Sequence, residues 1–238
     1  MPTIHATHQR IGTRSHQCDT TATAAGPYGR HAFVLLDGIG STDEVQHWTR
    51  HQARTLAQFA AAVGDPVAAI AGLRTAISYD IEHPSLFDAT EPPSAVAVVA
   101  IHKPGQLLTV GWCGDSRAYW LPAGGTAELI THDHNVLAEE QMAGRSCPLW
   151  YRNRITSHLG STDGCIGLEH RIVTCGGRLL LASDGTYNPL EDHGHNLTHL
   201  LGTGTPRDAA RTLVATALGT ADPRHDNATT LVVDIDPA

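Results

Sequence analysis

The sequence predicts an α+β fold built in layers, and three observations support this. Two helical segments follow one another early in the chain, and several short strands then follow in a run. Strands and helices do not alternate strictly, as they would in a doubly wound parallel sheet. The 238 residues are 41% hydrophobic and 17% charged, and no Pro/Gly/Ser-rich linker divides them. We therefore expect a single domain covering residues 1–238.

The first elements are a strand and a pair of helices. An apolar run at Ala32–Leu36 predicts a buried strand. The stretch "STDEVQHWTRHQARTLAQFAAAV" then carries apolar residues at helical spacing, and Ser41 or Thr42 can cap it. The break at Gly64–Pro66 ends this helix, and a second helix continues to about Tyr79. The short turn between them predicts an antiparallel helix pair.

Strands dominate the middle and the end of the chain. The segments "SAVAVVAIH", "QLLTVGWCG" and "RAYWL" are β-branched or aromatic, and the turns "KPG" and "GDS" separate them. This texture predicts an antiparallel meander. The region from Asn135 to about Arg152 has mixed polarity, and we expect it to be irregular with some helix. The remaining expected elements are strands near Leu168–Thr174, at Arg178–Ala182 and at Thr229–Ile235, and a helix at Pro206–Leu218.

Charge and cysteine content exclude several classes of protein. The formal net charge is −8 and the pI is near 6.0, so a nucleic-acid partner is not expected. The five cysteines form no C-x-x-C pair, which predicts neither a zinc framework nor a disulfide scaffold and is typical of the reducing cytoplasm. No apolar run reaches membrane-spanning length and no signal peptide is visible, so we expect no membrane partner. Most of the 16 histidines stand in polar stretches and are expected on the surface or in loops.

Four aspartates stand where an expected strand meets a loop: Asp37, Asp115, Asp184 and Asp226. A single aspartate beside glycine or asparagine is an ordinary turn residue. Four at strand boundaries, three of them beside strongly apolar strands, indicate that they project from one end of the sheets. Clustered carboxylates repel one another unless a hard cation such as Mg²⁺ or Mn²⁺ binds among them. The pattern therefore predicts a divalent-metal site.

The same residues resemble the motifs of a known family, the metal-dependent Ser/Thr protein phosphatases of type 2C. Five segments appear in the family's order and cover nearly the whole chain. They are "RSHQCD" (Arg14–Asp19), "DGIG" (Asp37–Gly40), "GDSRAYW" (Gly114–Trp120) followed by "LITHDHN", "LLLASDG" with Asp184 as its acid, and "DNATTLVV" beginning at Asp226.

This resemblance implies a fold, an activity and a cofactor. The implied fold is a four-layer α-β-β-α sandwich, in which two central, mostly antiparallel sheets are flanked by helix pairs. The implied activity is hydrolysis of phosphoserine and phosphothreonine monoesters in proteins by a metal-activated water. The implied cofactor is Mn²⁺ or Mg²⁺, as two core ions and a weaker third. A phosphorylated protein would be the substrate, a Ser/Thr kinase a possible counterpart, and the chain would act as a monomer.

The resemblance also implies roles for individual residues. Asp37 would bridge the two core ions, and Gly38 would offer its backbone carbonyl to one of them. A side chain at Gly38 would obstruct that approach. Asp184 and Asp226 would hold the first ion, and Asp115 with Asp184 the weaker third. Arg14 would grip the substrate phosphate, because its planar fork suits paired oxygens.

The chain departs from the family pattern at several positions. Cys18 stands where the family has a glutamate that helps to hold water on the second ion, and Asp19 and Asn227 are further candidates near the ions. A thiol is a weak acceptor, so we expect a weak second metal site and a preference for Mn²⁺. Alternatively, Asp19 takes over the role or the thiol packs against the strand. Ser41 replaces a glycine, Ile39 stands where some members have a histidine, and the flap between His134 and Asn153 is short.

Two other interpretations compete with this one. The "SDGT" segment is also similar to the Asp-x-Asp-Gly-Thr loop of haloacid-dehalogenase-like phosphatases. That loop requires an aspartate two residues before Asp184, where Ala182 stands, and Leu35 stands at the matching place before Asp37. The second alternative is a catalytically silent phosphatase-like domain that binds phosphoproteins or partners. Loss of the acid at Cys18 favours it, and retention of Arg14 and the four aspartates opposes it.

Overall fold

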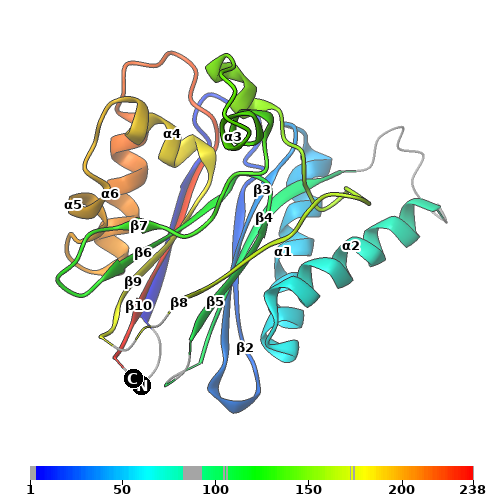
Figure 1. The fold of residues 1–238 in the computed structure, drawn as a ribbon, viewed down its shortest axis with the longest axis horizontal. Helices are drawn as coiled ribbons and strands as arrows, with labels where there is room; N and C mark the ends of the chain where they lie inside the picture. Colours follow the sequence, from blue (N-terminus) through cyan, green and yellow to red (C-terminus); the bar gives the residue numbers. More distant parts are fainter. Residues whose placement is uncertain are drawn as a thin grey trace.

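Two five-stranded sheets form the centre of the protein (Figure 1). The computed structural model describes residues 4–82, 93–103, 105, 107–171, 173 and 175–237. Every strand pair within the two sheets is antiparallel. One sheet has the order β1 (Ile4–Arg10), β10 (Ala228–Ile235), β9 (Gly177–Ala182), β6 (Arg117–Pro122) and β7 (Glu128–Leu129). The other has the order β2 (Thr20–Ala25), β3 (His31–Gly38), β4 (Ala95–His102), β5 (Leu108–Cys113) and β8 (Gly167–Arg171).

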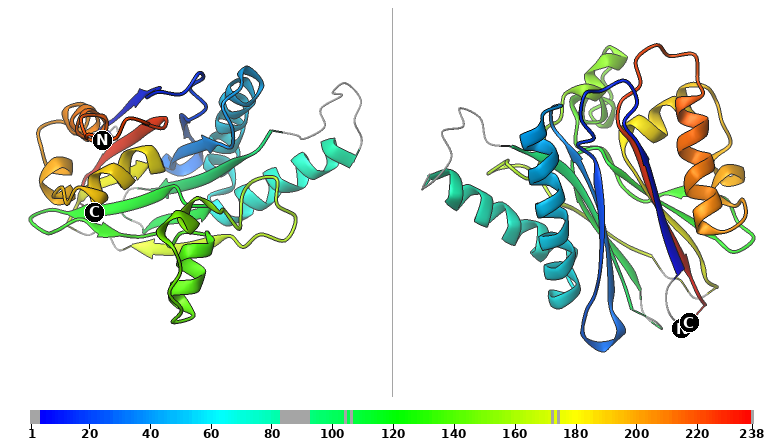
Figure 2. Two further views of the ribbon diagram at one scale, coloured as in Figure 1. Left: turned by 90° about the horizontal axis from the view of Figure 1, so that it is seen from above. Right: turned by 180° about the vertical axis from the view of Figure 1, so that it is seen from behind.

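Helices cover the outer face of each sheet (Figures 1 and 2). The β2–β8 sheet is covered by α1 (Asp43–Val63) and α2 (Pro66–Glu82). The β1–β7 sheet is covered by α4 (Asp184–Asp192), α5 (Leu197–Leu201) and α6 (Pro206–Leu218). Three short helices complete the described chain: η1 (Pro27–Gly29), α3 (Val136–Met142) and η2 (Leu149–Asn153). This is the four-layer α-β-β-α sandwich that the resemblance implied.

Three separate apolar layers hold the four layers together. Alternation along the central strands explains them, because successive side chains of a strand point to opposite faces. In β3, Val34 and Leu36 pack toward α1 and α2, whereas Phe33 and Leu35 pack between the sheets. In β9, Leu180 packs toward α4 and α6, and Leu179 and Leu181 pack between the sheets. The apolar runs in the sequence are therefore strands that are buried on both faces.

The predicted helix pair is confirmed with small shifts at its ends. Of the two expected caps, Thr42 is the one used: its hydroxyl accepts a hydrogen bond of 3.2 Å from the Val45 amide. Gly64 ends α1 with φ of +79°, a left-handed conformation that glycine adopts without strain. Asp65 then caps α2 through the amides of Val67 and Ala68, so the sharp turn is stabilised on both sides.

The predicted meander is wrong at its last step. Strands β4 and β5 pair as expected, but β6 leaves them and pairs with β9 and β7 in the other sheet. The crossing occurs in the turn at residues 114–116. Gly114 has φ of +105°, and a Cβ there would lie 2.2 Å from Val96, so only glycine fits. A turn between sheets looks like a hairpin turn in sequence, because both join apolar strands through glycine and aspartate.

Besides the very short β7 and η1, the sequence pattern missed β1, β2, α4 and α5, which lack strong apolar periodicity. Edge strands β1 and β2 are mostly exposed or half-buried and rich in polar or small residues. Helix α4 contains Gly185 and Pro189, which usually interrupt helices, and α5 has only five residues. The strand expected near Leu168–Thr174 is β8, which the structure places at Gly167–Arg171. Residues 172 and 174 of the expected strand lie outside the described residues. No helix in the described part of the chain is long and apolar enough to cross a membrane.

Candidate functional site

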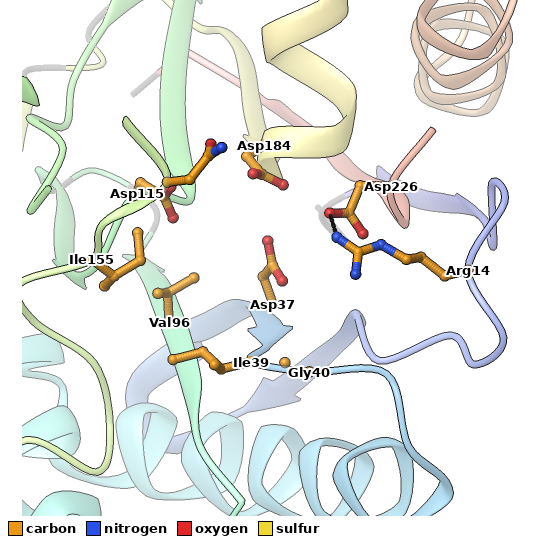
Figure 3. Close-up of a pocket in the computed structure, with 11 residues that line it drawn as sticks. Arg14, Asp37, Ile39, Gly40, Val96, Asp115, Ile155, Asp184 and Asp226 are labelled. Atoms are coloured by element: carbon orange, nitrogen blue, oxygen red, sulfur yellow. Dashed lines mark hydrogen bonds and ion pairs between the residues drawn. The ribbon is translucent and has the colours of Figure 1, made fainter. Parts of the chain in front are cut away.

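One cavity of about 280 Å³ opens at the end of the sandwich where the four aspartates stand (Figure 3). Six of the residues expected in the site line it: Arg14, Asp37, Gly38, Asp115, Asp184 and Asp226. Five further residues complete the lining: Ile39, Gly40, Val96, Asn153 and Ile155. Cys18, Asp19 and Asn227 do not line it. The structure thus brings together the acids that the sequence placed at strand ends. The three candidates Cys18, Asp19 and Asn227 lie outside the cavity lining.

Both sheets contribute carboxylates to this cavity. Asp37 is the penultimate residue of β3, and Asp115 lies in the turn that crosses between the sheets. Asp184 is the first residue of α4, just after β9, and Asp226 stands just before β10. Strands β9 and β10 are paired neighbours. Figure 3 shows the four carboxylates turned toward a common space.

The acids lie in surroundings that disfavour their charged forms. Removal from water raises the pKa of Asp37 and of Asp115 well above the usual aspartate value, and neighbouring carboxylates raise both further. Burial, and then the charge of Asp226, raises the pKa of Asp184 to about 6. Such a cluster is costly when ionised, and a bound cation would relieve the cost.

Arg14 supplies the nearest positive charge. Its guanidinium donates a hydrogen bond to Asp226 Oδ2, and the two side chains are 48% and 38% exposed (Figure 3). That hydrogen bond raises the pKa of Arg14, so the guanidinium stays charged. Because both partners remain half-exposed, the pair can be approached by a ligand from solvent.

The donor set fits a hard divalent cation by its chemistry. The four acidic side chains that line the cavity are aspartate carboxylates. Their oxygen atoms suit Mg²⁺ and Mn²⁺ as ligands better than they suit softer metals. As the side chains stand, no three His, Cys, Asp or Glu residues among those described are grouped closely enough to hold a metal. In this arrangement Asp226 is paired with Arg14, and the charges of neighbouring carboxylates raise the pKa values of Asp37 and Asp115.

Gly38 has a reason to be glycine that the sequence did not reveal. A Cβ at this position would lie 2.7 Å from Val45 Cγ1, 2.8 Å from the Cys18 carbonyl oxygen and 2.9 Å from Cys18 Cβ. The obstruction is therefore close packing between β3, α1 and the segment of Cys18. The expected reason, access of a ligand to the Gly38 carbonyl, is not needed to explain the glycine.

Cys18 lies behind the cavity wall. Its amide donates a 2.7 Å hydrogen bond to Asn227 Oδ1, and its thiol points to the Thr42 carbonyl at 3.6 Å. Burial raises the pKa of this thiol, so the neutral form is favoured. The Asn227 side chain also donates to the Ile11 carbonyl at 2.9 Å. Cys18 and Asn227 thereby tie the Arg14 segment to the Asp226 segment, while the expected weak second metal site stays a prediction.

Asp19 is a buried carboxyl beside the cavity. It is 2% exposed and accepts a 2.8 Å hydrogen bond from the Ser183 hydroxyl. Burial raises its pKa to about 8, and the charges of Asp184 and Asp226 act in the same direction. Ser183 also accepts from the Thr229 amide at 3.0 Å. Asp19 therefore supports the backbone from which Asp184 projects.

Arg117 stands in the "GDSRAYW" motif without an expected role, and the structure supplies one. Its guanidinium binds Asp133 through two hydrogen bonds of 2.8 Å and Glu191 through bonds of 2.8 and 2.9 Å. It also lies over the ring of Tyr187, 3.9 Å from the centroid, and the Tyr187 hydroxyl donates to the Asp115 carbonyl at 2.8 Å. Burial alone would lower the pKa of Arg117, but the bonds to Asp133 raise it. This network holds the Asp115 turn against α4.

The fold is shared with solved bacterial phosphatases. Serine/threonine phosphatase Stp1 from Staphylococcus aureus matches with a TM-score of 0.83 at 20% identity, covering 99% of this chain and 96% of that one. The S. agalactiae serine/threonine phosphatase matches with a TM-score of 0.81 at 21% identity, covering 98% of this chain and 100% of that one. The catalytic domain of the phosphatase PstP, solved with two manganese ions, matches with a TM-score of 0.71 at 21% identity over 98% of each chain.

Together, these observations define the fold class of the chain. The chain has the α-β-β-α fold of the bacterial serine/threonine phosphatases, with an acidic cavity at one end of its sheets. No model of a known protein family and no curated protein matches the sequence.

Proposed function

We propose that this chain is a metal-dependent protein phosphatase of type 2C, which hydrolyses phosphoserine and phosphothreonine monoesters in proteins. The observation that carries the proposal is the meeting of four aspartates and Arg14, from segments far apart in sequence, in one cavity. Carboxylates alone would repel an anionic phosphate. Such a cavity suits a phosphoester when cations lie between the acids and the substrate.

The proposed metal ligands are Asp37, the Gly38 carbonyl, Asp184 and Asp226 for two core ions, with Asp115 and Asp184 for a weaker third. When bound, Mn²⁺ or Mg²⁺ would activate a water for attack on phosphorus and offset the charge of the phosphoryl oxygens. The two manganese ions in the PstP catalytic domain, a structure with the same fold, support this choice of cofactor.

Arg14 is the proposed phosphate-binding residue. Its partner Asp226 is half-exposed, so a phosphate oxygen can share the guanidinium without a large desolvation cost. The planar fork of arginine presents two parallel donors, which match two oxygens of a phosphate. Arg14 would orient the ester across the cavity from Asp115 (Figure 3).

The wider setting of this activity is also part of the proposal. The substrate would be a phosphorylated protein, a Ser/Thr kinase would supply it, and the chain would work as one monomeric domain in the cytoplasm. The net charge of −8 is the reason for proposing no nucleic-acid partner.

A second candidate function is a catalytically silent module that binds phosphoproteins. Cys18 favours it, because this thiol is buried and turned to the Thr42 carbonyl, so it offers no carboxylate beside the cavity. The four retained aspartates favour the enzyme, because a binding module has no need for several costly buried acids.

The test is turnover of p-nitrophenyl phosphate and of a phosphothreonine peptide with Mn²⁺, with Mg²⁺ and with a chelator. We expect metal-dependent turnover that falls by at least about 100-fold in Asp37→Asn, because a ligand shared by both ions is lost. Asp163→Asn, an exposed loop aspartate outside the cavity lining, is the matched control. Near-native turnover in Asp37→Asn would contradict the metal assignment, and absence of turnover with every metal in the wild type would favour the silent module.

A further inference from the structure

A second cavity, of about 520 Å³, lies beside the segments that carry Arg14 and Asp226. Gln17, Leu218 and His225 are among the residues that line it, and it shares no lining residue with the acidic cavity. Its volume falls in the range of about 300 to 1,000 Å³ that is usual for sites of small organic ligands. The phosphatase function proposed above gives this cavity no role.

Gln17 is the residue that marks this cavity as a binding site. It is 9% exposed, and neither the nitrogen nor the oxygen of its side-chain amide has a hydrogen-bond partner among the described residues. A buried amide without partners has given up its hydrogen bonds to water and is costly to the folded protein. The cavity that Gln17 lines offers the space in which a ligand can supply the missing partners.

The backbone around Gln17 is held on both sides. The Gln17 carbonyl accepts a 2.9 Å hydrogen bond from the side chain of Gln46 on α1. The amide of the next residue, Cys18, donates a 2.7 Å hydrogen bond to Asn227 Oδ1. The fold therefore sets the place of the Gln17 side chain before any ligand arrives, and a ligand would lose little free energy in ordering it.

His225 brings a second polar atom without a partner to the same cavity. Its Nδ1 is buried and forms no hydrogen bond with a described residue. Ile11 and Leu218 contribute apolar side chains to the lining. A few polar groups placed among apolar walls are typical of sites that bind small organic molecules and fix their orientation. The combination suits a flat ring that has hydrogen-bonding atoms along its edge.

The chemistry of the amide sets the class of ligand. A glutamine side chain presents an acceptor oxygen beside a donor nitrogen. Its full complement is a donor beside an acceptor, as in other amides, in lactams and along the edges of nucleobases. Glutamine binds adenine in nucleic acids through such a pair of hydrogen bonds. A phosphate or a carboxylate offers acceptors alone and would leave the oxygen of Gln17 unpaired.

We propose that the second cavity binds a small neutral heterocycle of the nucleobase class, whose amide-like edge pairs with the side chain of Gln17. His225 Nδ1 takes another polar atom of the ring, and Ile11 and Leu218 pack against its faces. The site is separate from the acidic cavity, and binding in it requires neither a metal ion nor a phosphoester.

The two cavities share their supporting backbone. Thr13, which precedes Arg14, donates hydrogen bonds of 2.9 Å from its amide and from its hydroxyl to the carbonyl of His225, which precedes Asp226. A heterocycle that contacts Gln17 and His225 would hold these two segments together, so Arg14 would lose less freedom when it binds a phosphate. Where the proposed phosphatase function holds, saturating heterocycle should lower KM for a phosphopeptide by about fivefold, the lower end of usual coupling between sites.

The binding test is calorimetry on the metal-free protein with three neutral probes. Adenosine and inosine each carry a donor beside an acceptor on the base, whereas purine riboside keeps the ring and the sugar and lacks the donor. We expect the wild type to bind adenosine or inosine at least about tenfold more tightly than purine riboside, because a buried oxygen of Gln17 left unpaired costs about that factor. Neutral probes are used because an anion could bind Arg14 instead.

Three variants locate the binding. Gln17→Leu removes the amide at similar size, so it should abolish the preference over purine riboside and should raise the melting temperature without any probe, because an unpaired polar group is gone. Gln58→Leu, a change at an exposed glutamine of α1 outside both cavity linings, is the matched control and should keep the preference. Leu218→Trp fills the second cavity and leaves the amide in place, so it should abolish binding. It keeps the proposal testable if Gln17→Leu does not fold.

The outcomes separate the second cavity from the phosphatase function. If the wild type binds neither adenosine nor inosine, or binds purine riboside equally well, the proposal is overturned. Binding that persists in both Gln17→Leu and Leu218→Trp would place the heterocycle elsewhere and overturn it too. Binding without a change in KM would support the site and refute its coupling to Arg14. If the wild type hydrolyses no phosphoester with any metal, the phosphatase function and the expected change in KM fail, and calorimetry still tests the site.

Discussion

Arg14 lines the acidic cavity and Arg117 supports the Asp115 turn; each arginine binds an aspartate, yet their surroundings differ greatly. Arg14 is 48% exposed and holds Asp226 through one hydrogen bond. Arg117 is 15% exposed, binds Asp133 and Glu191, and covers the Tyr187 ring. The same ion-pair chemistry therefore serves two purposes. A half-exposed pair can exchange a partner for a ligand, whereas a buried network fixes the position of the backbone.

Removal of Arg117 should have the largest effect on stability and is the strongest test of this difference between the two arginines. In Arg117→Ala, Asp133 would keep a nearly buried carboxylate without its guanidinium, and Glu191 and Tyr187 would lose their contacts. Removal of one partner of a buried pair typically costs about 3 to 5 kcal/mol of unfolding free energy. We expect a loss of that order in chemical denaturation, whereas Arg14→Ala should lose less than about 1 kcal/mol. Equal losses in the two variants would contradict the comparison.

Removal of Arg14 should act on the substrate instead. Arg14→Ala should raise KM for a phosphopeptide about tenfold or more, with a smaller or comparable fall in kcat, because the guanidinium binds phosphate before and during reaction. Arg10→Ala, a change in exposed β1 outside the cavity lining, is a matched control. Steady-state kinetics at saturating Mn²⁺ measure both constants. An unchanged KM would place Arg14 outside the phosphate site.

The acids offer a smaller, pH-dependent test. Burial raises the pKa of Asp19 to about 8. Between about pH 4, the usual pKa of an aspartate, and about pH 8, the folded protein therefore binds more protons than the unfolded chain. The free energy of unfolding must then fall as pH rises, by up to about 1.4 kcal/mol per pH unit for one proton. Without metal, we expect stability to fall between pH 6.5 and 8, a window above the titration of His102, His134 and His158, because burial lowers the pKa values of these three from 6.5.

The controls for this test are one substitution and one ion. Asp19→Asn should reduce the pH dependence, because one titrating carboxyl is gone while the raised carboxyls of Asp37 and Asp115 remain. Mn²⁺ should raise the melting temperature more at pH 8 than at pH 6.5, because cations bind the ionised acids. Stability that rises with pH in metal-free protein would show that the buried carboxyls do not control it.

The sequence predicted the parts that depend on local pattern. The buried strands, the pair α1 and α2, and helix α6 follow from periodicity and capping, and the four aspartates were found because each stands at the boundary of a strand. The crossing of β6 to the other sheet was missed, because the role of Gly114 depends on its contact with Val96 in a neighbouring strand. Asn153 and Ile155 were missed as cavity residues for the same reason. Ile155 is held by its backbone bridge to Asn135, and Asn153 stands at the end of η2.

The pairing of β1 with β10 has a consequence for how the protein is made. These two strands come from opposite ends of the described chain and pair over seven residues, and the N and C marks lie together in Figure 1. Arg14 and Asp226, which meet just beyond this pairing, are 212 residues apart in sequence. Contacts of such long range form slowly and late. A chain still emerging from the ribosome would therefore lack its acidic cavity until β10 had been synthesised, so nascent copies would be inert.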